Sequence, residues 1–279
     1  MAILSPRETD GYIHFDEAEC IAAGKALADQ YQNAQPFPHI VIDDFLPRDF
    51  LKGLLTGFPD TAGHDYFDRS QERLKYQFRP SDIPGRSLRN MVMELNSPAI
   101  LRFLQAMTGI GGLIADPYFM GGGLHETRKG GHLGVHADFN IHPKLKIERR
   151  LNLLVYLNDD WPEEYGGHLE LWDQKMQKCC HRVLPTLGRA VVFNTSLDSF
   201  HGQPEPLTSP DERGRRSIAT YYYTAHEDGI AALPTRTTVF KVRPSSMDKE
   251  DVKVRFNHLL RDWLPPAIYR MARKSTQQD

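Results

Sequence analysis

Two histidines and one aspartate are the residues of this sequence whose types and order could hold a reactive metal. His136 and Asp138 are separated by one residue, and His201 follows in a later segment; we call these three residues the triad. Alternate residues of a β-strand point to the same face, so a single strand would present His136 and Asp138 together. Two imidazoles and one carboxylate bind one face of a divalent iron and leave its other positions open for an oxidant and a co-substrate. The triad therefore predicts a reactive iron site.

A His-x-Asp pattern on its own is weak, because short motifs of common residues also arise by chance. The pattern occurs three times, beginning at His14, His136 and His226. His14 lies near the start of the chain, and His226 lies in a polar, turn-like segment. Only His136 is followed by strand-like runs that lead to a further histidine and then to an arginine. We therefore expect the metal at His136, with Asp16 and Asp228 outside the site.

The arginine that follows this motif indicates a second ligand, a dicarboxylic acid. If residues 215–223 form a strand, Arg215 and Ser217 face one side and Arg216 faces the other. Inside a narrow barrel, an arginine fork beside a hydroxyl group suits a carboxylate. The alternative is a surface charge beside Arg213, and the triad upstream favours the carboxylate site.

A zinc hydrolase is the main alternative for this donor set. Such enzymes also use two histidines and a carboxylate, but they need a general base beside the metal-bound water. The sequence has no His-Glu-x-x-His motif, and Asp198, just before His201, lies in a turn-like run and not in a helix. We therefore favour iron and oxygen chemistry.

Composition narrows the class of protein. The chain has 279 residues and a formal net charge of −2, so it can form a large core and has no excess charge that would favour nucleic acid. Its three cysteines, Cys20, Cys179 and Cys180, are too few and too badly spaced for a disulfide framework. It has neither a long apolar run nor an apolar leader. We expect a cytoplasmic protein that binds neither nucleic acid nor a membrane.

The first part of the chain has mainly helical patterns. Helices are expected at 16–33 with Asp16 as N-cap, at 47–58 and at 86–107 with an interruption at Ser97-Pro98, and a short strand is expected at 39–42. Segment 59–82 is polar and only weakly periodic, so we expect an irregular loop. It is either a lid over the substrate or a solvated linker.

Short strands dominate the rest. They are expected at 112–119, 122–127, 132–140, 151–157, 168–172, 182–184, 189–193 and 217–225, with turn signals such as Gly130-Gly131 between them. This series of short strands separated by turns predicts a sandwich or barrel. Together with the earlier helices, it predicts a mainly β fold (α+β) with helices on one side. We expect one domain over 1–242, with a helical layer at 1–110 and a β-core at about 111–242, and then a C-terminal helix and basic tail at 243–279.

Four segments resemble a known enzyme family. They lie between about residues 124 and 225 and read "HADF", "LLVYLNDDWPEEYGGHLELW", "AVVFNTSLDSFHGQPEPL" and "RRSIATYYYTA". Together they resemble the iron(II)- and 2-oxoglutarate-dependent dioxygenases, most closely the prolyl 4-hydroxylase-like branch. The resemblance implies a double-stranded β-helix, which is a cupin-like jelly-roll, buttressed by N-terminal helices. It also implies Fe(2+), 2-oxoglutarate and O2, with ascorbate as a reductant.

The resemblance gives the candidate residues their roles. The triad would bind the iron, and Arg215 and Tyr156 would hold the distal carboxylate of 2-oxoglutarate. Ser217 would assist Arg215, and Leu169 matches a position that lines the same pocket.

Two positions depart from the family pattern. His125 and Glu126 stand where many members have a tyrosine one strand before the first ligand. Tyr221 stands where a tryptophan is common after the arginine.

The resemblance also implies a reaction. A dioxygenase of this type couples oxidative decarboxylation of 2-oxoglutarate, which gives succinate and carbon dioxide, to hydroxylation of an unactivated carbon. Proline, free or in a peptide, is the substrate that the family suggests, and another amino acid or small metabolite is the alternative. A non-catalytic cupin-like binding protein would be favoured by loss of a ligand or of the arginine, and a halogenase by a small residue at Asp138; neither change is present. We expect a small-molecule or peptide partner, with a homodimer left open.

Overall fold

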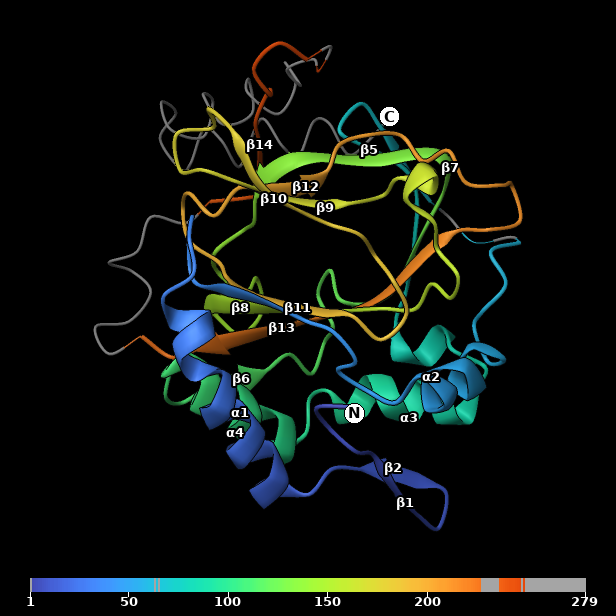
Figure 1. Ribbon diagram of the computed structural model, residues 1–279, viewed down its shortest axis with the longest axis vertical. Helices are drawn as coiled ribbons and strands as arrows, with labels where there is room; N and C mark the ends of the chain where they lie inside the picture. Colours follow the sequence, from blue (N-terminus) through green and yellow to red (C-terminus); the bar gives the residue numbers. More distant parts are fainter. Residues whose placement is uncertain (1, 63, 65, 227–235, 247, 249–279) are drawn as a thin grey trace, which may run out of the picture.

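The structure is a computed structural model that describes residues 2–62, 64, 66–226, 236–246 and 248. Most of the segment 243–279, where a C-terminal helix and basic tail are expected, lies outside the described residues. A small hairpin of β1 (Arg7–Thr9) and β2 (Tyr12–His14) stands at the start of the chain. The remaining strands form one antiparallel sheet that curls into two facing halves (Figure 1).

Strand β7 (Gly123–Ala137) belongs to both halves of the sheet. Its first part pairs with β13 (Arg215–Thr224), and its last part pairs with β12 (His201–Gln203). The sequence predicts a turn between two strands at Gly130-Gly131, and this prediction is wrong. Gly130 has a φ of 76°, and an added Cβ at Gly131 would lie 2.7 Å from the Arg73 carbonyl oxygen. The two glycines therefore bend one continuous strand instead of ending it.

Each half of the sheet extends outward from β7. The first half continues from β13 to β8 (Glu148–Tyr156), β11 (Ala190–Asn194) and β3 (His39–Ile42). The second half continues from β12 to β9 (Leu169–Trp172) and β10 (Cys179–Val183). The short strands β6 (Ile114–Ala115) and β14 (Val239–Phe240) pair with β13 and β7. This arrangement confirms the predicted double-stranded β-helix.

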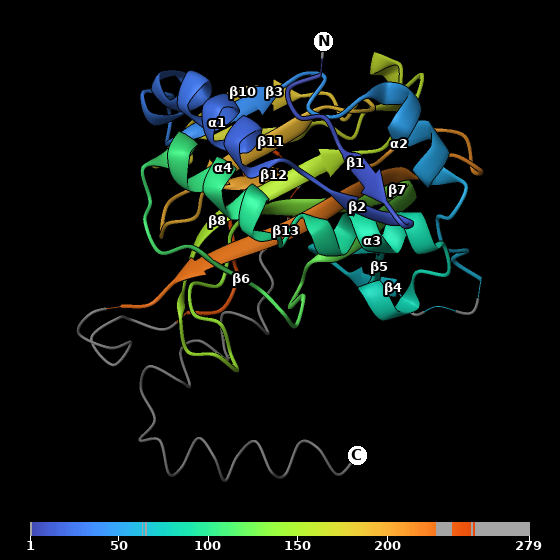
Figure 2. The same cartoon turned by 90° about the horizontal axis from the view of Figure 1, so that it is seen from below.

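Helices cover the outer face of the first half, as Figure 2 shows from the helical side. They are α1 (Glu17–Gln32), α2 (Arg48–Leu55), α3 (Arg86–Glu94) and α4 (Pro98–Thr108), with 3-10 turns at Pro80–Asp82 and Glu163–Tyr165. The predicted N-cap is confirmed, because Asp16 accepts a hydrogen bond from the Glu19 N–H, and in the structure Ser97 also caps a helix by accepting one from the Ile100 N–H. The helices predicted from the sequence are therefore present, including the interruption before Pro98.

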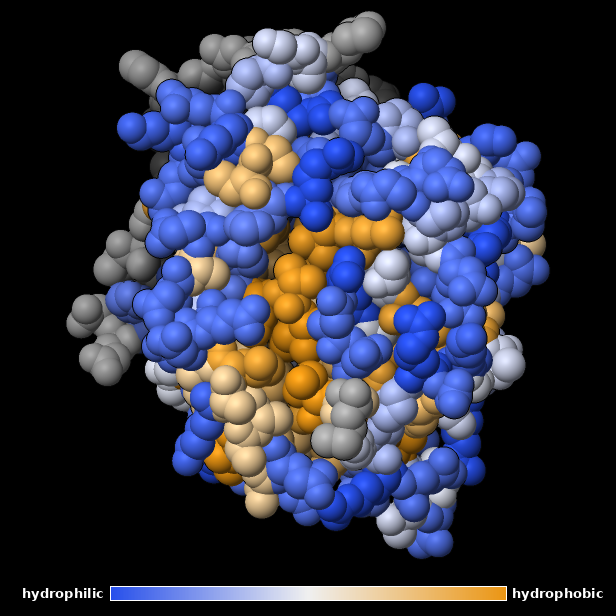
Figure 3. Space-filling model, in the orientation of Figure 1, coloured by the Kyte–Doolittle hydropathy of each residue, from blue (hydrophilic) through white to orange (hydrophobic). Residues whose placement is uncertain are grey.

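Successive residues of the central strands pack into two different cores, one on each face of the sheet. On β8, Leu151, Leu153 and Val155 pack outward against the helices. Tyr156 packs inward in a second cluster with Leu169 and other residues between the halves. On the face drawn in Figure 3, apolar residues gather in the middle and hydrophilic residues surround them. Polar residues that share the inward face with this second cluster are therefore candidates for function.

The segment 59–82 is not the irregular loop that the sequence predicts. It forms a hairpin of β4 (Tyr66–Arg69) and β5 (Glu72–Phe78), and β5 pairs with β7. Phe78 is buried in the core beside the helices, whereas Lys75 and Gln77 point into a cavity between the halves. Polar residues on the inward face weaken the hydrophobic alternation that would have marked this strand.

In the part of the chain that the structure describes, no helix has the length and apolar character needed to span a membrane.

Candidate metal centre and active site

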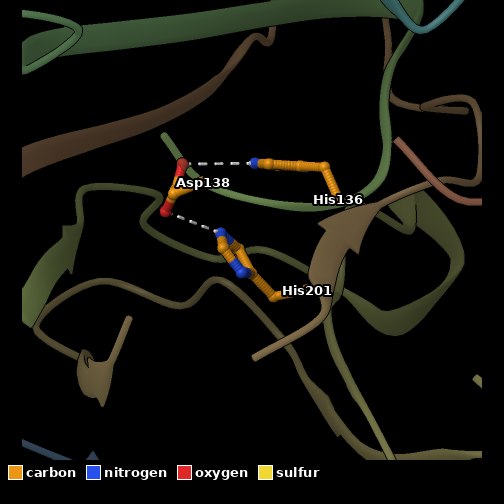
Figure 4. A group of neighbouring side chains, drawn as sticks. All are labelled: His136, Asp138 and His201. Carbon is orange, nitrogen blue, oxygen red and sulfur yellow. Dashed lines mark ion pairs between the residues drawn. The ribbon is translucent and has the colours of Figure 1, made fainter. Parts of the chain in front are cut away.

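The triad comes together where β7 ends beside β12 (Figure 4). The sheet register pairs His136 with His201, and Asp138 follows directly after β7. The Nε2 atom of His136 lies 3.6 Å from Asp138 Oδ1, and the Nε2 atom of His201 lies 3.4 Å from Asp138 Oδ2. All three side chains are buried, and one donor atom of each lies within 4.8 Å of the others. Among the described residues, no other group of three or more His, Cys, Asp or Glu side chains is placed to hold a metal, and His14 is not near the triad.

Hydrogen bonds fix both imidazoles in the form that binds metals. His136 Nδ1 lies 2.8 Å from the Gly134 carbonyl oxygen, and His201 Nδ1 lies 3.0 Å from that of Ser199. Because a carbonyl oxygen only accepts, each Nδ1 carries a proton, which leaves Nε2, the nitrogen on the side of Asp138, as the atom that can bind a metal. Burial, followed by the charge of His136, lowers the pKa of His201 to about 4, so this imidazole is neutral at physiological pH. The donor set thus fits a divalent transition metal.

Arg149 and Asn152 hold the carboxylate of Asp138 from β8. The Asn152 amide donates to Asp138 Oδ2 at 2.8 Å, and Arg149 Nη2 lies 3.1 Å from the same oxygen. Arg149 also donates from Nε and Nη2 to Asn152 Oδ1, at 3.0 and 2.7 Å. Burial alone would raise the pKa of Asp138, but Arg149 and the two histidines hold it well below its usual range. The carboxylate is therefore ionised, with Oδ2 occupied by the protein.

Sequence analysis missed Arg149 and Asn152. Arg149 is fully buried, with its guanidinium carbon 3.5 Å from the centre of the Tyr221 ring and 4.7 Å from that of Phe139. The only signal for them is that β8 begins with three charged residues and has one amide residue within its apolar run. That signal does not say which partner each residue has.

A cavity of about 280 Å³ opens beside the triad. Arg215, Ser217 and Leu169 line it together with the triad. The register of β13 places Arg215 opposite Thr127, and Ser217 opposite both His125 and Tyr156. Arg215 and Ser217 therefore face the interior of the sheet, as the alternation along the strand predicts.

Arg216 lies on the opposite face of β13, where its Nε donates to Glu126 Oε1 at 3.1 Å.

Arg215 is held at the end of the cavity away from Asp138. Its Nε donates to the Gly167 carbonyl oxygen at 2.6 Å, and its Nη2 donates to the Tyr156 hydroxyl at 3.2 Å. Tyr156 is fully buried, and this burial raises its pKa, so the hydroxyl stays protonated. Arg215 and Tyr156 are thus adjacent and oriented toward each other, which is a suitable arrangement for one carboxylate.

The β4–β5 hairpin also lines the cavity, with Phe67, Arg69, Glu72, Lys75 and Gln77. The sequence predicts a lid or linker here and does not identify these side chains as part of the site. Their alternation would have revealed them only if the segment had been recognised as a strand.

Comparison with known proteins places the chain in a family context. Residues 122–233 match the family described as the 2OG-Fe(II) oxygenase superfamily. The chain is 26% identical over 201 residues to the mouse (Mus musculus) prolyl 3-hydroxylase OGFOD1. The aligned region covers 67% of this chain and 33% of that protein. It therefore spans about a third of the length of this relative.

Two solved structures have a similar fold. A Pseudomonas putida prolyl-4-hydroxylase is 16% identical, covers 73% of this chain and 100% of its own, and gives a TM-score of 0.50. A Trichoplax adhaerens prolyl hydroxylase, in complex with a peptide fragment of the hypoxia inducible factor oxygen degradation domain, is 14% identical. It covers 74% of this chain and 91% of its own, with a TM-score of 0.51. At these identities the likeness concerns the fold.

Proposed function

We propose that this chain, which matches the 2OG-Fe(II) oxygenase superfamily over residues 122–233, couples oxidative decarboxylation of 2-oxoglutarate to hydroxylation of an unactivated carbon. The observation that carries this proposal is the shared cavity, which the triad and Arg215 both line, with the buried Tyr156 hydroxyl 3.2 Å from Arg215 Nη2. A binding site for the metal and a binding site for a distal carboxylate are what a chelating keto dicarboxylic acid requires.

His136, Asp138 and His201 would hold the iron. Bound there with 2-oxoglutarate, iron(II) supplies the activation of dioxygen that hydroxylation requires. The backbone carbonyls behind the imidazoles orient both Nε2 atoms, and Asn152 and Arg149 keep Asp138 ionised. These contacts define a rigid donor set before a metal arrives.

Arg215 would bind the distal carboxylate of 2-oxoglutarate, and the Tyr156 hydroxyl would donate a further hydrogen bond. Ser217 lies two residues after Arg215 on the same face of β13. Its hydroxyl would therefore contact the part of 2-oxoglutarate next to the distal carboxylate. Leu169 would form the apolar side of this pocket. Excluding water in this way strengthens the attraction between the guanidinium and the carboxylate.

Proline, free or within a peptide, is the proposed prime substrate, because the relatives named above are prolyl hydroxylases. Another amino acid or small metabolite is the alternative. Ascorbate as a reductant, a cytoplasmic location and a homodimeric state stay predictions.

The test is single-turnover oxidation. The protein is loaded anaerobically with iron(II) and 2-oxoglutarate and is then exposed to oxygen with a panel of amino acids, peptides and metabolites. We expect succinate to form and one panel member to gain one oxygen atom by mass spectrometry. Binding of iron and 2-oxoglutarate without any succinate would instead indicate the non-catalytic binding protein.

A further inference from the structure

The cavity wall has more positive than negative side chains. Four cationic and two anionic residues line it among the described parts of the chain, namely Arg69, Lys75, Arg149, Arg215, Glu72 and Asp138. Iron(II) and the 2-oxoglutarate dianion carry equal and opposite charges. The excess of two positive charges therefore remains when both have bound.

A bend in β5 places two of these charged residues on the same side of the strand. In a regular strand, positions 72 and 75 would face opposite sides. Here Glu72 pairs with Leu133 and Lys75 pairs with Thr127, with a register shift between Arg73 and Lys75. Leu74 lies within this shift and has a φ of 50°, which is unusual for a residue with a side chain. As a result Glu72 and Lys75 both line the cavity.

Glu72 and Lys75 form an ion pair that is largely withdrawn from water. The Lys75 Nζ atom lies 2.8 Å from Glu72 Oε1, and the side chains are 14% and 16% exposed. Such a pair adds little to stability, because desolvation offsets much of the attraction. An ammonium group has three N–H donors, so Lys75 can serve a second acceptor while it keeps Glu72.

Lys75 is a second cation near Arg215, but it comes from another strand. It lies on β5, on the opposite side of β7 from Arg215 on β13, and both residues pair with Thr127. Burial, and then the charges of Lys75 and Arg215, hold the pKa of His125 well below its usual range, which agrees with two cations facing one region. Arg215 already has Tyr156 beside it, whereas Lys75 and the exposed Arg69 both lie against the ring of Phe67, at 5.7 and 5.8 Å.

We propose that the prime substrate carries a carboxylate, which Lys75 binds and Arg69 assists. This inference rests on the proposed function, because it concerns the second substrate of the same cavity. The carboxylate has two sources, the free carboxyl group of an amino acid or the acidic side chain of a peptide. In both cases the β4–β5 hairpin selects the substrate by charge.

The test compares each carboxylate with its amide. The probes are L-proline with L-prolinamide, and acetyl-Pro-Glu-amide with acetyl-Pro-Gln-amide. Binding is measured calorimetrically under anaerobic conditions to the protein that holds iron(II) and 2-oxoglutarate. Formation of that complex tests the proposed function, and the preference within a probe pair tests the charge selection.

Three variants differ in their expected effect on the carboxylate preference of the wild type. The wild type should bind the carboxylate of one pair about tenfold or more tightly than its amide, since a hydrogen bond between charged groups is worth at least about 1.5 kcal/mol. Lys75→Met should remove this preference, and Glu72→Gln should increase it, because Lys75 loses its competing partner. Arg73→Met is the matched control, since Arg73 is exposed and pairs with Asp68, and it should keep the preference.

Equal binding of carboxylate and amide by the wild type would overturn the proposal, as would a preference that survives Lys75→Met. A Lys75→Met variant whose affinity for 2-oxoglutarate falls more than its carboxylate preference would also overturn it, because Lys75 would then serve the co-substrate. The pair that shows the preference identifies the source of the carboxylate.

Discussion

Arg149 and Arg215 are buried in the same cavity, but the protein neutralises only Arg149. Arg149 lies 3.1 Å from Asp138, whereas none of the ion pairs among the described residues involves Arg215, which contacts a carbonyl and a hydroxyl group. A buried charge without a counter-charge is costly. We interpret the Arg149 end of the cavity as complete in the free protein and the Arg215 end as awaiting the carboxylate of a ligand. Five substitutions, compared with control variants, test this difference, and each affects one end of the cavity.

The largest effect is expected for the triad. Asp138→Ala or His136→Ala should abolish the charge-transfer absorption of the iron–2-oxoglutarate complex, because two donors cannot hold the metal and the co-substrate together. His14→Ala, in the first His-x-Asp pattern, should leave this absorption intact. The reverse result would place the metal elsewhere.

Arg215→Ala tests the open end. It removes the proposed partner of a buried carboxylate, which costs about 3–5 kcal/mol, so the dissociation constant of 2-oxoglutarate should rise on the order of a hundred- to a thousandfold. Calorimetric titration with 2-oxoglutarate measures this change, and metal titration without the keto acid should remain normal. Arg216→Ala is the control on the opposite face of β13, and its effect on 2-oxoglutarate binding should be small. A large effect at Arg216 with little at Arg215 would contradict the assigned face.

Arg149→Met tests the closed end. The substitution leaves Asp138 charged, buried and without its arginine, so the free energy of unfolding of the metal-free protein should fall by about 3–5 kcal/mol. Denaturant unfolding measures the loss. Lys129→Met breaks an exposed pair with Asp211 and should cost only about 0–1 kcal/mol. If Arg215→Ala destabilised the metal-free protein as much as Arg149→Met, the contrast between the two ends would be wrong.

Of the two substitutions at the open end, Tyr156→Phe should have the smaller effect on 2-oxoglutarate binding. It removes one hydrogen bond to a charged group, which is worth about 1.5–3 kcal/mol, so 2-oxoglutarate should bind about ten- to a hundredfold more weakly. The same titration places this loss between those of Arg215→Ala and Arg216→Ala. A loss as large as that of Arg215→Ala would mean that the tyrosine positions the guanidinium.

The predictable part of the site follows from periodicity within single strands. Alternation alone gives His136 and Asp138 one face, and it separates Arg215 and Ser217 from Arg216. The contact of Arg149 with Asp138 joins different strands, and its partner depends on how the sheet curls.

The fold was missed where polar residues face the interior or where glycines bend a strand. On β5, Lys75 and Gln77 face the cavity, so the apolar alternation that marks a buried strand is absent. At Gly130-Gly131 the glycines indicate a turn, although the positive φ of Gly130 and the close approach of Arg73 and Thr127 to Gly131 explain them equally well. Both misses concern chain segments whose surroundings are set by other strands.

The bend in β7 has a consequence for the size of the co-substrate. Thr127, opposite Arg215, and His136, opposite His201, lie on this one strand on either side of Gly130-Gly131. The spacing between the carboxylate end and the metal end of the cavity is therefore set by a single stretch of backbone. If the proposed function holds, a change in the length of segment 128–131 would change this spacing, and with it the length of keto acid that can span the cavity. Discrimination between keto acids of different chain length would then depend on the backbone of β7.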